Sequence, residues 1–277
     1  MDGAEQRKGM PTAHNGDVAL AYDRAGPPSA PTVVFVEGLG YGTWMWQFQR
    51  DPLAADYDTI VFDNRGTGDS DCPEGPYTIA EMADDLAAVL DDAGVESAHV
   101  VGASMGGMIA QRFALDHGRA DSLSLLCTSH GGEDAVPVPP ETQAYMFDVP
   151  EDADEREAIR YKMTPAISDG FAEEHPELIE DIVDWRLDSD ASEAGRNAQA
   201  AAVQAFDAAD ELAELSLPTL ILHGTDDEVL PVENAHALQE RLPHAELELL
   251  EGGPHLFFVE QADAVTDRLR TFLDSHA

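Results

Sequence analysis

A single serine stands among small residues where a predicted strand meets a predicted helix. Gly102, Ser104 and Gly106 belong to the run "VVGASMGGMIA" (100–110) and match the pattern G-x-S-x-G. On a sharp strand-to-helix turn, small neighbours let the strand and the helix approach, and the hydroxyl is raised above the sheet edge at a helix N-terminus. In this context the pattern favours a nucleophilic Ser104 over an incidental serine in a glycine-rich turn.

A serine hydroxyl needs a base, and the base needs a carboxylate that orients it. Of the ten histidines, His255 in "GGPHLFF" follows the last predicted strand, where a loop residue reaches the carboxyl edge of a parallel sheet. His130 is the only other histidine expected near that edge, and His223 in "LILHGTDD" is expected to pack or hydrogen-bond locally. The same segment offers two candidate carboxylates, Asp226 and Asp227.

Alternating strands and helices must position these residues. After a first strand at 17–26, apolar runs without alternation predict buried parallel strands at 31–40 and 57–66. The alternating strand and helix order predicts further strands at 97–104, 121–129, 217–227 and 245–253. Helical spacing predicts helices at 78–90, 105–118, 232–242 and 256–273, the first with a Thr78/Glu81 capping box. An acid-rich, helical-looking stretch interrupts the order. We expect an α/β core of residues 1–132 and 215–277 and a helical cap, or lid, of residues 133–214.

The chain resembles the α/β-hydrolase superfamily, whose members carry their triad in the chain order Ser, acid, His. Ser104 and His255 fit this order. The acid of the family usually falls three residues after the glycine of an H-G-x-x-D pattern, which points to Asp227 rather than Asp226. The resemblance implies the α/β-hydrolase fold, a mostly parallel central sheet flanked by helices with a helical lid inserted before the last two strands.

Attack of Ser104 on a carbonyl leaves an oxyanion that needs two N–H donors. One is expected to be the N–H of Met105, directly after the nucleophile. The resemblance implies that the other is the N–H of Leu39, in the turn after the strand "VVFVEGLG". The usual His-Gly pair of the family is here Glu37-Gly38, so a carboxylate of unassigned role stands near the site.

A second stretch, "FDNRGTGDSD" (62–71), resembles the D-x-R-G-x-G-x-S segment of the family. We expect Asp63, Arg65 and Ser70 to tie down this loop, which is a structural role. Several bulky residues could line an apolar substrate pocket, although such residues at helical spacing are more often core: Trp44, Trp46, Phe48, Tyr145, Met146, Phe147 and Trp185.

The 277 residues include 55 acidic and 15 basic side chains, a formal net charge of -40. Such a surface disfavours binding to nucleic acid or an anionic membrane, because both need basic clusters. The acids are interspersed with periodic apolar positions, which argues against disorder. The composition resembles proteins of salt-loving microbes, in which molar salt shortens the Debye length to roughly 3 Å.

The sequence lacks several segments and patterns that would indicate a membrane or secreted protein. It has neither a long apolar run of the kind that spans a membrane nor, in residues 1–17, the apolar core of a signal peptide. The irregular spacing of Cys72 and Cys127 gives neither a disulfide framework nor a zinc site. We therefore expect a cytoplasmic protein with plain thiols, and the sequence leaves its oligomeric state open.

The expected reaction is acyl transfer to Ser104, with His255 as base and then acid and Asp227 orienting it, without a metal or an organic cofactor. The whole chain is similar to the esterase, enol-lactonase and cofactor-free haloperoxidase group, so a small-molecule carboxylic ester or lactone is the expected substrate. Ser104 stands where haloalkane dehalogenases and epoxide hydrolases of this fold carry Asp. Two alternatives remain open, a carbon–carbon bond hydrolase with the same triad and a non-catalytic ligand-binding protein.

Overall fold

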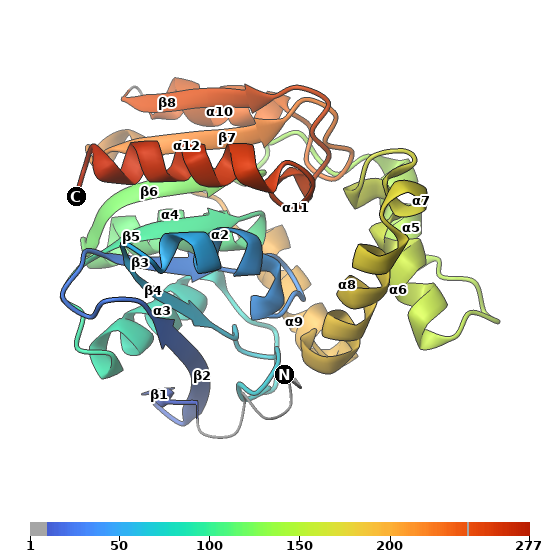
Figure 1. The fold of residues 1–277 in the computed structure, drawn as a ribbon, viewed down its shortest axis with the longest axis horizontal. Coiled ribbons are helices and arrows are strands. Elements are labelled where there is room, and N and C mark those ends of the chain that lie inside the picture. Colours follow the sequence, from blue (N-terminus) through green and yellow to red (C-terminus); the bar gives the residue numbers. More distant parts are fainter. Residues whose placement is uncertain (1–9, 243) are drawn as a thin grey trace.

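The computed structural model describes residues 10–242 and 244–277, so residues 1–9 of the predicted core lie outside it. Its framework is an eight-stranded sheet in the order β1-β2-β4-β3-β5-β6-β7-β8 (Figure 1). The strands are β1 (Thr12–Asn15), β2 (Val18–Ala25), β3 (Thr32–Val36), β4 (Asp58–Phe62), β5 (Ala98–Ala103), β6 (Ala120–Leu126), β7 (Thr219–Gly224) and β8 (Ala245–Leu250). The pairs β1/β2 and β2/β4 are antiparallel, and all the other pairs are parallel.

The parallel strands at the centre of the sheet are buried on both faces. In β3, Val33 and Phe35 pack into one hydrophobic layer, whereas Val34 and Val36 pack into the other. Because successive side chains of a strand point to opposite faces, a strand covered on both sides becomes a continuous apolar run. The interpretation of "VVFV" as a buried strand is confirmed.

Helices cover both faces of the sheet. One layer contains α3 (Ile79–Asp92), α4 (Met105–His117) and α10 (Glu233–Arg241), and the other contains the short η1 (Thr43–Trp46), α2 (Gln47–Leu53), α11 (Phe257–Glu260) and α12 (Ala262–Asp274). The predicted capping box at the start of α3 is present, with Thr78 and Glu81 each accepting a backbone N–H of the other.

Three features of the core differ from the sequence prediction. The prediction did not include β1, a four-residue strand with only one buried residue, or α2, which contains Pro52. The single helix expected at 256–273 is two helices, because the backbone leaves the helical conformation at Gln261 (φ -111°, ψ 39°). Short elements of this kind carry too few periodic positions to be recognised in the sequence.

Between β6 and β7 the chain forms a group of helices that we call the inserted helices. They are α5 (Pro140–Phe147), α6 (Glu155–Met163), α7 (Phe171–Glu174), α8 (Pro176–Ser189) and α9 (Glu193–Ala205), with the turns η2 (Thr164–Ala166) and, before β7, η3 (Leu212–Glu214). Figure 1 shows α5 to α8 standing to one side of the sheet, with α9 running back toward it. The inserted helices therefore add no strand to the sheet.

Aromatic side chains join the inserted helices to the core. Trp44 stacks on Trp185 of α8 at 6.0 Å between ring centroids, whereas the fully buried Trp46 stacks on Phe258 of α11, within the core, at 5.4 Å. Of the other candidates for the pocket, Tyr145 packs on Tyr161, and the Phe147 side chain lies outside the described part of the structure. In the described residues, no helix is long and apolar enough to cross a membrane.

Candidate active site

The turn between β5 and α4 holds Ser104 in a conformation that few non-glycine residues adopt, with φ 53° and ψ -118°. Hydrogen bonds on both sides fix this strained residue. Its N–H donates to the carbonyl of Leu126 (2.9 Å), and its carbonyl accepts from the Thr128 hydroxyl (2.6 Å) and from the N–H of Gly107 (3.0 Å). A strained backbone conformation of this kind persists only where the surrounding contacts fix it, and such conformations are concentrated at functional sites.

Close backbone contacts explain the small residues around Ser104. A Cβ on Gly106 would lie 2.0 Å from the carbonyl oxygen of Val36, and one on Gly102 would lie 2.3 Å from the carbonyl oxygen of Gly106. A Cβ on Gly107 would lie 2.6 Å from the Thr128 side chain. The motif therefore lets α4 start directly against β3 and β5.

Asp227 and His255 meet beyond the ends of β7 and β8. His255 Nδ1 lies 2.8 Å from Asp227 Oδ2, and both side chains are buried. The other carboxylate oxygen, Oδ1, accepts the N–H groups of Val229 and Leu230, each at 2.8 Å. Asp226 instead accepts the hydroxyl of Thr225 at the surface. The structure thus brings Asp227, and not Asp226, to His255.

A second histidine contacts the same carboxylate. Nε2 of the buried His223 lies 2.8 Å from the Leu230 carbonyl, which is the local bond expected from the sequence, and also 3.3 Å from Asp227 Oδ2. Burial alone would raise the pKa of Asp227, but its contacts with His255 and His223 outweigh burial and hold the pKa well below its usual range. Asp227 is therefore an anion that can stabilise a charged imidazole beside it.

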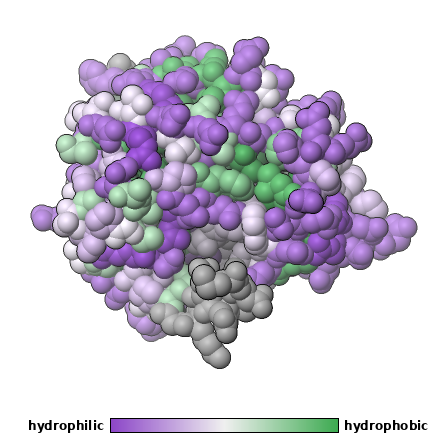
Figure 2. Space-filling view, in the orientation of Figure 1, coloured by the Kyte–Doolittle hydropathy of each residue, from purple (hydrophilic) through white to green (hydrophobic). Residues whose placement is uncertain are grey.

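Ser104 and His255 line one cavity of about 720 Å³ between the core and the inserted helices. From the core, Gly38, Leu39 and Cys127 share this lining, and the opposite wall comes from α5, α6, α8 and α9. Figure 2 shows green hydrophobic side chains gathered where the two parts of the molecule meet, within a mostly purple surface. His130 is buried elsewhere and does not line the cavity.

In the turn after β3, the N–H groups of Gly38 and Gly40 have different acceptors. The N–H of Gly38 points to the sulfur of Met45 (3.4 Å), and that of Gly40 donates to Gln199 Oε1 (2.7 Å). Between them, the N–H of Leu39 has no recorded acceptor within the described residues, and Leu39 lines the cavity. Met105 begins α4, so its N–H has no acceptor inside the helix. Met105 thus directly follows Ser104, and Leu39 lines the same cavity as Ser104.

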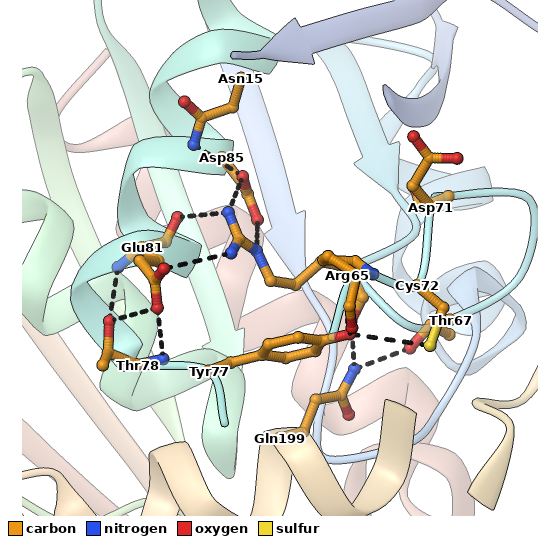
Figure 3. A network of polar contacts seen from close by, with 12 residues as sticks. Asn15, Arg65, Thr67, Asp71, Cys72, Tyr77, Thr78, Glu81, Asp85 and Gln199 are labelled. Carbon is orange, nitrogen blue, oxygen red and sulfur yellow. Dashed lines mark hydrogen bonds and ion pairs between the residues drawn. The ribbon is translucent and has the colours of Figure 1, made fainter. Parts of the chain in front are cut away.

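Gln199 of α9 connects this turn to a second loop. Its Nε2 donates to the carbonyl of Arg65 and to the hydroxyl of Thr67, both at 2.9 Å (Figure 3). Its Oε1 accepts the N–H of Gly40. Gln199 is fully buried. The N–H of Ala191 also donates to the Gly40 carbonyl (3.0 Å). The inserted helices thus hold the turn that carries Leu39, a role that the sequence analysis missed.

The 62–71 loop is tied down as the sequence predicted. Arg65 binds Asp85 of α3 with two hydrogen bonds, of 2.6 and 2.7 Å (Figure 3). The Ser70 hydroxyl donates to the Asp63 carbonyl (2.5 Å) and accepts the N–H of Ala21 (2.9 Å). Arg65 does not line the cavity, which agrees with a structural role.

Glu37 lies beneath the turn and not in the cavity. It is fully buried, its Oε2 accepts from Asn64 Nδ2 at 3.3 Å, and its Oε1 has no hydrogen-bond partner among the described residues. Burial, and secondarily the charge of Asp63, raise the pKa of Glu37 well above its usual value. A buried carboxyl of this kind is held as the neutral acid.

Cys127, Asp227 and His255 form the one described group whose potential ligand atoms could share a metal ion, all within 4.8 Å of one another. Asp227 and His255 are hydrogen-bonded to each other. Burial raises the pKa of the Cys127 thiol well above its usual value. A neutral thiol is a poor metal ligand. Cys127 and the exposed Cys72 are both free, as expected.

Known proteins resemble the chain over nearly its whole length. It is 31% identical to 3-oxoadipate enol-lactonase 2 of Acinetobacter baylyi over 252 residues, which is 90% of each protein. A solved structure of Est816, described as an N-acyl homoserine lactone degrading enzyme, has a TM-score of 0.81 and 31% identity, covering 95% of this chain and 100% of its own. An esterase from Exiguobacterium antarcticum has a TM-score of 0.83 and 27% identity, with coverage of 96% and 99%.

These similarities confirm the predicted fold, a mostly parallel sheet flanked by helices. The profile of the Alpha/beta hydrolase family matches residues 33–268, which include every residue of the candidate site. The chain therefore belongs to the alpha/beta hydrolase family.

Proposed function

We propose that the protein is a serine hydrolase that cleaves small-molecule carboxylic esters or lactones through an acyl-enzyme on Ser104. The observation that carries the proposal is that His255, hydrogen-bonded to the buried Asp227, lines the same cavity as the strained Ser104. The named activities of the relatives, an enol-lactonase, an acyl homoserine lactone degrading enzyme and an esterase, support this substrate class.

In the proposed mechanism, Asp227 holds Nδ1 of His255, which leaves Nε2 to take the proton of Ser104 as its oxygen attacks the carbonyl carbon. The N–H groups of Leu39 and Met105 bind the oxyanion of the tetrahedral intermediate, and each such donor contributes about 3–4 kcal/mol in known cases. His255 then gives its proton to the departing alcohol or enol oxygen. Water attacks the acyl-enzyme in the same way and releases the carboxylic acid and free Ser104.

We further propose that residues 133–214 act as a cap on a core formed by residues 1–132 and 215–277. The inserted helices supply the wall of the cavity that faces Ser104, so they would determine which acyl or alcohol groups fit. The reaction as written needs no metal ion or organic cofactor, because Ser104, His255 and two backbone groups carry out every step.

The test is labelling with a fluorophosphonate probe, mapped by peptide mass spectrometry, together with an ester and lactone panel assayed in molar KCl. We expect the label on Ser104 and hydrolysis of at least one class of ester or lactone. Ser104→Ala should lose the label and reduce kcat by several orders of magnitude, with an unchanged circular dichroism spectrum. A labelled wild type that hydrolyses none of these substrates, or a variant that keeps its activity, would refute the proposal.

The net charge of -40 supports a separate proposal, that the protein is adapted to concentrated salt. Screening by salt would remove most of the repulsion between its surface carboxylates.

A further inference from the structure

Three basic side chains of the inserted helices line the cavity that contains Ser104 and His255. They are Lys162 of α6, Arg186 of α8 and Arg196 of α9. The chain has only 15 basic residues against 55 acidic ones, so basic residues are scarce everywhere else on the molecule. Their concentration in one cavity suggests that they serve a ligand.

Lys162 and Arg196 have weaker ion pairs than the other basic residues that the structure describes. Within the described residues, every arginine has a carboxylate oxygen within 4.0 Å, whereas Lys162 has none. The only such contact of Arg196 is a long one, 3.8 Å from its Nη2 to Asp190 Oδ2. Two cations in the cavity thus lack a close counter-ion.

Asp190 does not neutralise the cluster, because its carboxylate is already shared by several donors. It accepts hydrogen bonds from Nε of Arg186 at 2.7 Å, from Nε1 of Trp44 at 3.1 Å and from the N–H of Gly42 at 3.2 Å. Arg186 is itself buried, and its Nη1 has no hydrogen-bond partner among the described residues. The guanidinium of Arg186 lies over the ring of Tyr41, 4.5 Å from its centroid, so Arg186 adds positive charge to the wall without presenting an open donor.

Acidic residues also line the cavity, and their exposure differs from that of the cations. Glu155 and Glu193 are exposed to solvent, whereas Lys162 and Arg196 are only partly exposed. Burial, followed by repulsion from the neighbouring arginines, lowers the pKa of Lys162, and burial together with Arg186 lowers that of Arg196. Among the less exposed charged side chains of the inserted helices in this wall, Lys162, Arg186 and Arg196 are basic and only Asp190 is acidic.

This positive wall lies beside the proposed oxyanion turn. A Cβ on Gly40 would come within 2.7 Å of Arg196 Nη1, so the guanidinium packs directly on the residue after Leu39. A ligand whose carbonyl oxygen binds at Leu39 and Met105 would have its remaining length in the cavity, where the basic side chains stand.

We propose that Lys162 and Arg196, beside the buried guanidinium of Arg186, form an anion subsite, and that the natural ester or lactone carries a carboxylate away from the bond that is cleaved. The role of the subsite in turnover rests on the proposed function. Its capacity to bind an anion does not, so the two can be tested separately.

The kinetic test compares two substrates of equal shape. The mono-p-nitrophenyl esters of succinic, adipic and suberic acid carry a terminal carboxylate, and their terminal primary amides do not. For the best chain length we expect the wild-type kcat/KM to be about tenfold or more higher for the acid than for the amide, mainly through KM. Lys162→Met and Arg196→Met should each bring this ratio toward one.

Arg160→Met is the matched control. Arg160 lies on α6 with Lys162, but it pairs with Glu180 at the surface and does not line the cavity. Its acid-to-amide ratio should equal that of the wild type. A wild-type ratio near or below one at every chain length would overturn the subsite and leave the serine hydrolase proposal standing.

The binding test uses Ser104→Ala protein and calorimetry with monomethyl adipate and its neutral amide. We expect the anion to bind about tenfold or more tightly, and this preference to disappear in the Ser104→Ala/Lys162→Met double variant. Equal affinities, or no measurable binding of either compound, would also overturn the subsite. Preferential binding of the anion by a protein that hydrolyses no ester would support the subsite and refute the proposed function.

Discussion

Asp227 is held by two backbone N–H groups and two histidines. We predict that Asp227→Asn lowers kcat about 10⁴-fold, because the amide N–H₂ cannot hold His255 in the tautomer that accepts the proton of Ser104. The measurement is steady-state hydrolysis of the best ester. Asp226→Asn, which removes the neighbouring surface carboxylate, should leave kcat unchanged; equal losses in the two variants would show that the loop and not Asp227 matters.

The buried Glu37 gives a prediction on pH. Its pKa is raised in the folded protein, so its contribution to stability is complete below its unfolded pKa of about 4.3 and is lost as the pH rises through the folded value. Glu37→Gln cannot ionise. Its free energy of unfolding relative to the wild type should therefore increase from pH 5 to pH 9, measured by urea denaturation at constant salt. Parallel pH profiles for the two proteins would contradict a buried neutral acid.

At the residue level, the sequence was sufficient to select those candidate site residues that belong to a local sequence pattern. The turn chemistry of the G-x-S-x-G run marked Ser104, and chain order together with the H-G-x-x-D spacing separated Asp227 from Asp226. Lys162, Arg186, Arg196 and Gln199 were not found, because they sit on acid-rich helices whose sequences do not show which side faces the core. Only the packing of the inserted helices on the distant core brings Gln199 to Gly40 and the three basic side chains to the cavity.

At the level of elements, β3 and β4 were predicted because continuous apolar runs require cover on both faces. The inserted helices were predicted as a helical region, but their arrangement was not. It depends on a few specific contacts, such as Trp44 on Trp185 and Gln199 on Gly40. Contacts of this type involve single residues far apart in the chain and leave no periodic signal.

The most informative of these contacts is Gln199. We predict that Gln199→Ala lowers both stability and kcat/KM, because it leaves the N–H of Gly40 and the carbonyl of Arg65 buried without partners. An unsatisfied buried group costs about 1–3 kcal/mol. Urea denaturation and ester hydrolysis measure the two effects. Gln204→Ala, an exposed glutamine on the same helix, is the control and should behave as the wild type; matching results for the two variants would exclude the proposed link between α9 and the turn.

On the scale of the whole molecule, the dominant feature is the negative surface. Some arginines at the surface lie between two acidic partners, as with Arg268 between Glu246 and Glu248 and Arg156 between Glu180 and Asp184. Single pairs of this kind contribute about 0–1 kcal/mol, so they cannot offset the repulsion of a net charge of -40.

We therefore predict that stability rises with salt. The melting temperature should be higher in 2 M KCl, a proposed test concentration at which the Debye length falls below about 3 Å, than in dilute buffer. Differential scanning calorimetry over a KCl series measures this. The non-ionic osmolyte sucrose at matched osmolarity should stabilise less, and equal melting temperatures at all KCl concentrations would contradict the charge argument.

The contacts of Gly40 with Gln199 and Ala191 also bear on protein engineering. One way to change the substrate range of such an enzyme is to replace its inserted helices with those of a relative and keep the core unchanged. Here a grafted replacement would remove the groups that keep the Leu39 amide in position. A working chimaera would have to bring its own partners for the Gly40 amide and carbonyl, or import the donor's oxyanion loop along with its helices.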